Sequence, residues 1–138
     1  MDSPHPEMKE RILAEVDDRF LALVGAINAM DIEKWASFYS DTAFVSAIAG
    51  TDCHEAKSAW VESIRAYFAA RKSQRVTPKV VRIEALSSSL ALLTSEENSA
   101  FELADGGGFQ GKHVFTMLWE KGVDGWKIIH SHESWSDE

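Results

Sequence analysis

The sequence predicts an α+β fold, in which helices come first and antiparallel strands follow. Apolar residues recur at steps of three and four through most of the first half of the chain, which is the spacing of a helix face. The second half alternates between apolar and polar residues and is divided by turn signals at residues 87–89, 105–108 and 124–125, a pattern typical of hairpin-linked strands. Helices followed by such strands belong to the α+β class and not to the α/β class.

The composition of the chain limits the binding partners and the cellular compartment that we expect. The chain of 138 residues is expected to form one domain, 1–138, with one core. Its formal charge of −8 argues against nucleic acid, because basic surface supplies most of that affinity, and equally against an anionic membrane surface. Cys53 is the single cysteine, so no intrachain disulfide can form, which fits a cytoplasmic location. No apolar run is long enough to span a bilayer.

The chain begins with a long predicted helix. Residues 6–30 carry one apolar stripe, and Pro6 suits a first helical turn. Asp31 is placed to cap a short second helix over residues 32–39.

A short strand and a third helix are expected next. Residues 42–48 are strand-like and end near Gly50. Asp52 and Glu55 have the spacing of a capping box, which predicts a helix over residues 55–71.

Four strands complete the predicted fold. Pro78 cannot donate a ladder hydrogen bond and so indicates an edge or a bulge near the start of the first of them. The expected strands span residues 76–86, 90–103, 109–121 and 125–135.

The last strand organises the functional interpretation. Its sequence, GWKIIHSHESW, places alternate side chains on one face. That face is apolar at its start and polar at its end, which fits a pocket wall better than a solid core. The residues predicted to share it are Trp126, Ile128, His130, His132 and Ser134.

The preceding strand is predicted to extend this wall. A hairpin loop with an even number of residues, either 124–125 or 122–125, places His113, Phe115, Met117 and Trp119 on the histidine face; a three-residue loop would reverse this. The opposite face is then outward and too apolar to be wholly solvated. We therefore expect it to pair with a second copy across a two-fold axis. Lys112, Val114, Thr116, Leu118, Ile129 and Glu133 are predicted to lie on this outer face.

Two segments, NAMDIEKWASFYSDTAFVSAIAG and DGWKIIHSHES, together resemble the SnoaL-like branch of the nuclear transport factor 2-like superfamily. The resemblance extends over residues 7–135. It implies a cystatin-like cone, in which a curved antiparallel sheet wraps around a long N-terminal helix and leaves a pocket at the open end. It also implies dimerisation through the outer sheet face. Members include isomerases, cyclases and hydrolases, as well as domains without activity, so the fold alone does not give the function.

Three residues are candidates for acid–base chemistry. His132 is the first choice, because histidine exchanges protons near neutral pH. Glu97 shares the more apolar face of its strand, and burial would raise the pKa of a carboxyl group there towards neutrality. The resemblance to ketosteroid isomerase implies that Tyr39 could donate a hydrogen bond to an oxyanion.

The remaining candidates concern ligand binding. Trp35 and Trp60 are expected to form the wall opposite His113, Phe115, Met117, His130 and Ser134. The three histidines lack the closed ligand pattern of a zinc site, so no metal is predicted.

The sequence therefore predicts a cytoplasmic homodimer that binds a small, largely apolar organic molecule. It would act on this molecule as an isomerase, cyclase or hydrolase by acid–base chemistry without a cofactor. The alternative is a non-catalytic ligand-binding or association module.

Overall fold

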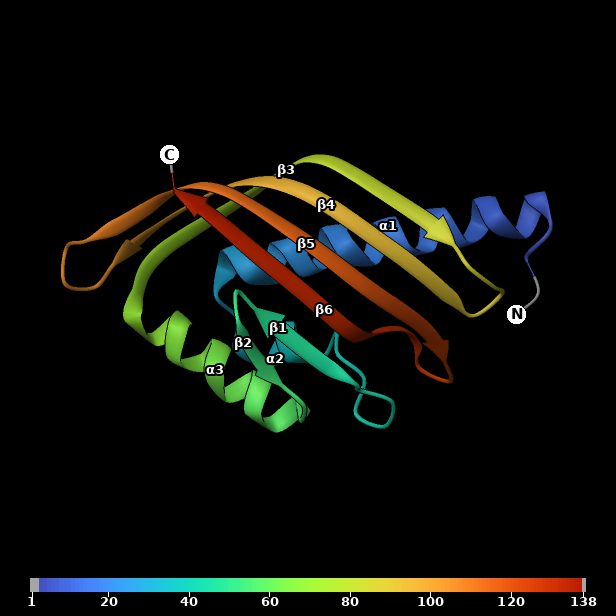
Figure 1. The fold of residues 1–138 in the computed structure, drawn as a ribbon, viewed down its shortest axis with the longest axis horizontal. Coiled ribbons are helices and arrows are strands. Elements are labelled where there is room, and N and C mark those ends of the chain that lie inside the picture. The colour runs from blue at the N-terminus through green and yellow to red at the C-terminus, as the bar shows by residue number, and fades with distance from the viewer. Residues whose placement is uncertain (1–2, 138) are drawn as a thin grey trace.

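The fold has the predicted order of helices and then strands (Figure 1). We describe it from a computed structural model, of which residues 3–137 are placed. The elements are α1 (Pro6–Ala29), α2 (Ile32–Ala36), β1 (Ser46–Ala49), β2 (Asp52–His54), α3 (Lys57–Ala70), β3 (Arg71–Ala85), β4 (Leu90–Leu103), β5 (Gly108–Gly122) and β6 (Gly125–Asp137).

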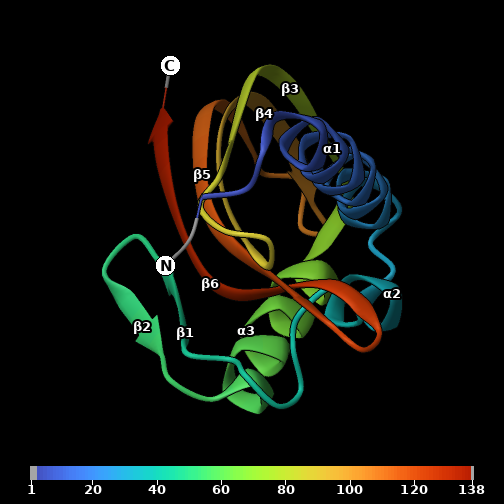
Figure 2. The same cartoon turned by 90° about the vertical axis from the view of Figure 1, so that its right-hand side faces the viewer.

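The strands form one curved sheet in the order β2-β1-β6-β5-β4-β3. Neighbouring strands are antiparallel, except that β1 runs parallel to β6. Figure 2 shows that the sheet is curved and that α1 and α3 lie on its concave side. The long N-terminal helix and the curved open sheet confirm the predicted α+β cone. In the described part of the chain, no helix has both the length and the apolar character needed to cross a membrane.

Helix α1 supplies much of the core. Pro6 occupies its first turn, and Nδ1 of His5 accepts a hydrogen bond from the backbone N–H of Met8. The helix ends at Met30, whose φ of 53° is left-handed, a conformation that commonly terminates helices. Its buried side chains form one stripe, as predicted: Ile12, Val16, Phe20, Leu23, Val24, Ala26 and Ile27.

The start of α3 differs from the prediction. Asp52 does not cap this helix, because Asp52–His54 forms β2 and pairs with β1 around Gly50. Gly50 has a φ of 63°, which suits glycine in a tight turn. Ala56 takes the N-cap position and provides no side-chain hydrogen bond. The capping-box prediction is therefore wrong: a local hairpin competes for the same residues.

Edge strand β3 behaves as Pro78 suggested. The pairing of β3 with β4 shifts register between Pro78 and Val80, and β3 lies at one edge of the sheet. An irregular edge discourages pairing with other chains.

A bulge in β6 changes which side chains face the inside of the cone. The β5–β6 loop is even, since Gly122 pairs with Gly125 and Trp119 pairs with Ile128. The next pair is Leu118 with His130, so Ile129 is an extra residue. One extra residue reverses the facing of every later side chain on the strand.

The bulge makes the predicted inward orientation of His130, His132 and Ser134 wrong. His132 and Ser134 are exposed. His130 is half-buried, and its Nδ1 lies 2.9 Å from Oγ of Ser46 on β1. Glu133, predicted to point outward, is instead 7% exposed on the inner face. Lys112 is exposed, as expected, because it lies on β5 and does not depend on the bulge.

Candidate functional site

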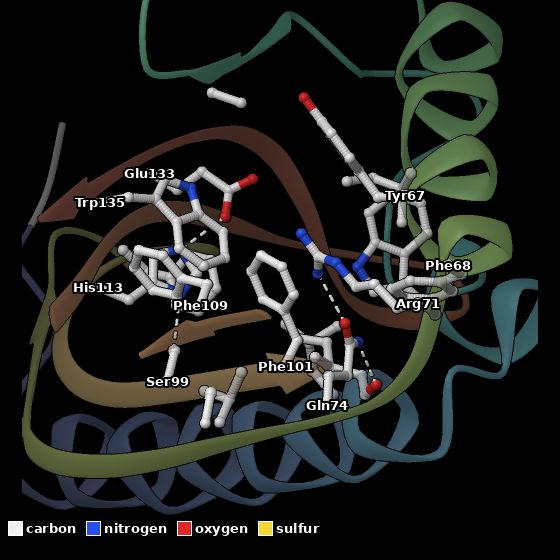
Figure 3. A pocket seen from close by; sticks show the side chains of 18 of the residues that line it. Tyr67, Phe68, Arg71, Gln74, Ser99, Phe101, Phe109, His113, Glu133 and Trp135 are labelled. Carbon is white, nitrogen blue, oxygen red and sulfur yellow. Dashed lines mark hydrogen bonds and ion pairs between the residues drawn. The ribbon is translucent and has the colours of Figure 1, made fainter. Parts of the chain in front are cut away.

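A cavity of about 250 Å³ lies between the concave face of the sheet and the helices (Figure 3). Two exposed aromatic rings, Tyr67 at 42% and Trp135 at 37% exposure, mark its mouth. The walls are mainly apolar and come from every long element. The polar side chains among them are few: Tyr39, Tyr67, Arg71, Gln74, Ser99, His113 and Glu133. A mostly apolar cavity with a few convergent polar groups is typical of small-molecule sites.

The helical wall is aromatic, as predicted. The ring centroids of Trp35 and Trp60 lie 5.7 Å apart, and Tyr39 lies 4.8 Å from Trp35 and 6.3 Å from Trp60. These three rings are at most 3% exposed. Phe115 and Met117 on β5 line the cavity from the sheet side. The structure thus brings together predicted residues from α2, α3 and β5, although β6 contributes different ones.

His113 is held on all sides. Its Nε2 lies 2.7 Å from Oε2 of Glu133, and its Nδ1 lies 3.2 Å from Oγ of Ser99. Trp135 stacks on the imidazole at 3.7 Å between centroids, with 20° between the planes. Phe115 lies 4.1 Å away. With both nitrogens hydrogen-bonded, His113 has no free ring nitrogen to offer to a ligand.

In the cluster of Ser99, His113 and Glu133, the carboxylate of Glu133 is the group that can still contact a ligand in the cavity. One of its oxygens is bound to His113, and Figure 3 shows the other directed away from the imidazole, on the side of Arg71. Sequence reasoning missed Glu133 because the bulge at Ile129 is not visible in simple alternation. The one signal in the sequence is the pair of adjacent isoleucines, Ile128 and Ile129. In the structure both are buried, at 0% and 8% exposure. Two successive buried residues break the period of two.

Glu97 lies on the inner face, opposite His113 in the β4–β5 register, but it does not line the cavity. It is 2% exposed, and its Oε2 accepts a 2.9 Å hydrogen bond from Ser95 while its Oε1 has no partner. Burial raises the pKa of Glu97 to about 8; the Ser95 hydrogen bond opposes this, and the negative charge of Glu133 adds to it. Glu97 is therefore a buried acid behind the wall rather than a group in contact with a ligand.

Tyr39 lines the cavity as a neutral hydroxyl. Burial raises the pKa of its phenol above the usual value, and the negative charge of Glu133 acts in the same direction. A phenol that keeps its proton can donate a hydrogen bond to an oxygen that gains negative charge.

Arg71 and Gln74 are cavity residues that the sequence analysis did not single out. Arg71 is half-buried, and its Nη1 donates a 2.6 Å hydrogen bond to Oε1 of Gln74. Burial lowers the pKa of the Arg71 guanidinium, while the charge of Glu133 acts in the opposite direction. No spacing pattern in the sequence marks either residue. Both reach the cavity because β3 begins directly after α3, at Arg71.

The described residues contain no set of three or more histidine, cysteine, aspartate or glutamate side chains arranged to hold a metal ion. The histidines considered as metal ligands do not share one face. Because of the bulge, His113 faces inward and His132 outward.

Solved structures share this fold at low sequence identity. A proposed dehydratase of the NTF2-like family from Streptomyces avermitilis superposes with a TM-score of 0.81 at 20% identity, covering 93% of this chain and 98% of that one. A proposed scytalone dehydratase from Novosphingobium aromaticivorans has a TM-score of 0.84 at 8% identity, covering 94% and 87%. Hexachlorocyclohexane dehydrochlorinase from Novosphingobium barchaimii has a TM-score of 0.77 at 12% identity, covering 91% and 87%.

These similarities establish the fold and, at such identities, nothing finer. No functionally curated protein is significantly similar to the chain in sequence. The family model of the SnoaL-like domain, however, matches residues 16–138, which include all the strands and the cavity. The chain therefore belongs to the SnoaL-like domain family.

Proposed function

We propose that this protein binds a small, largely apolar organic molecule and removes a proton from one of its carbon atoms, without a cofactor. The observation that carries the proposal is the carboxylate of Glu133, fixed by His113 at 2.7 Å on the wall of an aromatic cavity. Glu133 is the base and touches the substrate. His113 is a positioning residue, because it acts through Glu133.

The geometry suits proton abstraction for two physical reasons. The hydrogen bond from His113 fixes the orientation of the Glu133 carboxylate, so little reorganisation is needed at the moment of reaction. The neutral Tyr39 hydroxyl can stabilise negative charge that develops on a substrate oxygen when the electron pair of the broken C–H bond moves onto it.

The step after proton removal decides the reaction class. Return of the proton to another carbon gives an isomerase, whereas loss of a leaving group gives a lyase. The names of two structural neighbours, a proposed dehydratase and a dehydrochlorinase, both denote elimination reactions. The shared fold makes an elimination a reaction worth testing. At 20% and 12% identity, the neighbours do not assign that reaction to this chain.

The alternative function, a non-catalytic binding module, differs in one measurable property. Catalysed proton abstraction exchanges the α-protons of a ketone such as 2-tetralone with deuterium from D₂O, even without net turnover. We expect the protein to accelerate loss of the α-proton signal in NMR spectra by roughly a hundredfold or more, the usual contribution of a positioned base, and Glu133→Gln to lose this acceleration. A protein that binds 2-tetralone without accelerating exchange would be a binding module.

We further propose that the outer sheet face pairs with a second copy. The support is a band of β5 side chains that stay partly exposed, including Val114 at 38%, with Thr116 and Leu118 beside it. Because of the bulge, His132 and Ser134 lie opposite Thr116 and Val114 in register and join this face. Ile129 is buried at 8% exposure and so adds little to it.

A further inference from the structure

Arg71 is a cation that the proton abstraction described above does not use. It begins β3 directly after α3 and lines the cavity. In the part of the chain that the structure describes, no carboxylate lies within ion-pair distance of its guanidinium. Removing a charge from water without a counter-charge costs free energy, so its retention in an apolar cavity indicates a binding role.

The guanidinium is held in one orientation. Gln74 accepts a hydrogen bond from its Nη1 at 2.6 Å, and Nε2 of Gln74 in turn donates to the backbone oxygen of Ile27 near the end of α1. Phe101 lies beneath the guanidinium at 4.0 Å, and Tyr67 lies 5.3 Å away. A guanidinium has five N–H donors, and Figure 3 shows the end not bound to Gln74 directed towards Glu133 and Trp135. Such preorganisation lowers the entropic cost of binding.

Arg71 and the base lie across the same aromatic space. The Arg71 guanidinium is 5.8 Å from the ring of Trp135, and that ring stacks on His113. Phe109 stands edge-on to Trp135 at 5.4 Å and stacks with Phe101 at 5.3 Å. The cation and the base therefore both border the same group of aromatic rings, formed by Phe101, Phe109 and Trp135.

We propose that the cavity selects an organic carboxylate with a planar, apolar body. The carboxylate would pair with the free donors of Arg71, and the body would lie against Phe101, Phe109 and Trp135. A carbon atom remote from the carboxylate would then face Glu133. This last step rests on the proposed function, whereas carboxylate recognition by Arg71 does not. Planar, two-pronged contact with a carboxylate is the interaction for which a guanidinium is best suited.

The test compares two probes that differ only in charge. Naphthalene-2-carboxylate is ionised at neutral pH, and naphthalene-2-carboxamide is its uncharged counterpart of similar shape. Isothermal titration calorimetry measures both against the wild-type protein, Arg71→Met and Arg75→Met. Arg75 is the matched control, because it lies on the same strand but is exposed and outside the cavity lining.

We expect the wild-type protein to bind the carboxylate roughly tenfold or more tightly than the amide, as charge-assisted hydrogen bonds imply. Arg71→Met should remove this preference, because it weakens carboxylate binding much more than amide binding, whereas Arg75→Met should keep the preference. Gln74→Glu should also remove it, since a neighbouring carboxylate would occupy the guanidinium.

Each contrary result has a distinct meaning. Equal binding of both probes, or a preference that survives in Arg71→Met, would overturn carboxylate recognition and leave the proposed base untouched. Failure of both probes to bind the wild-type protein would overturn the inference together with the proposed apolar ligand site. Catalysed exchange of 2-tetralone is measured separately, so loss of that activity would not bear on Arg71.

Discussion

Nε2 of His113 and Oε2 of Glu133 lie 2.7 Å apart, with His113 2% and Glu133 7% exposed. The two residues come from adjacent strands, but they meet only because a bulge in β6 turns Glu133 inward. Ser99 on β4 completes the arrangement from the other side of the imidazole. Three neighbouring strands thus fix one carboxylate at the wall of an aromatic cavity.

His113→Gln should lower kcat for proton abstraction and leave KM little changed. The glutamine side chain cannot hydrogen-bond Ser99 and Glu133 at once as the imidazole does. Glu133 would therefore lose its fixed orientation while the cavity walls stay in place. We expect a decrease of about tenfold to a hundredfold. Steady-state kinetics with 5-nitrobenzisoxazole, a chromogenic substrate for proton abstraction from carbon, measures both constants. A raised KM with unchanged kcat would show that His113 binds ligand instead.

Glu97 should make stability depend on pH. Its pKa is about 8 in the folded protein against a reference value of 4.5, so the folded state holds the proton more tightly. The contribution is fully present below about pH 4.5 and is lost as the pH rises towards about 8, at up to about 1.4 kcal/mol per pH unit. Glu97→Gln keeps an acceptor for Ser95 but cannot ionise. Urea unfolding should show the variant gaining on wild type as pH rises, whereas a constant difference would contradict the burial of this charge.

His132→Ala should have little effect on chemistry. The side chain is exposed on the outer face and does not line the cavity, so it touches neither the base nor a ligand bound there. The rate of 5-nitrobenzisoxazole elimination should equal that of wild type. A large loss of rate would mean that β6 lacks the bulge at Ile129.

Local patterns in the sequence predicted most of the fold, because the apolar pattern of most elements agreed with their burial. The stripe of α1 is the clearest example, and Leu90–Leu103 matches its predicted bounds. The parallel pairing of β1 with β6 could not be predicted in this way, since it joins segments far apart in the chain.

On the sheet side, the candidate site was predicted only where the strands are regular. His113, Phe115 and Met117 obey simple alternation on β5 and line the cavity. On β6, the extra residue at Ile129 turns Glu133 into the cavity, where the simple alternation had placed His132. Register is a property of two strands together, so a single-strand pattern cannot reveal a bulge.

The outer face provides a prediction about assembly. If Thr116 and Leu118 lie in an interface, the protein should be a dimer at micromolar concentration in light scattering. Leu118→Arg should yield a monomer, because an interface core does not accept an unpaired charge. The exposed Val123, at the β5–β6 turn, offers a control position, and Val123→Arg should remain dimeric. A monomeric wild-type protein would contradict the proposal.

The most direct test of the central claim is the rate of 5-nitrobenzisoxazole elimination with wild type, Glu133→Gln and Glu102→Gln. A carboxylate base takes the proton from carbon, the electron pair of the C–H bond forms a nitrile, and the ring N–O bond breaks to give a coloured cyanophenolate without any co-reactant. Glu102 is an exposed acid on β4 and serves as the matched control. We predict that Glu133→Gln lowers kcat/KM by roughly a hundredfold or more while Glu102→Gln matches wild type. Equal rates for wild type and a folded Glu133→Gln variant would contradict the assignment of Glu133 as the base.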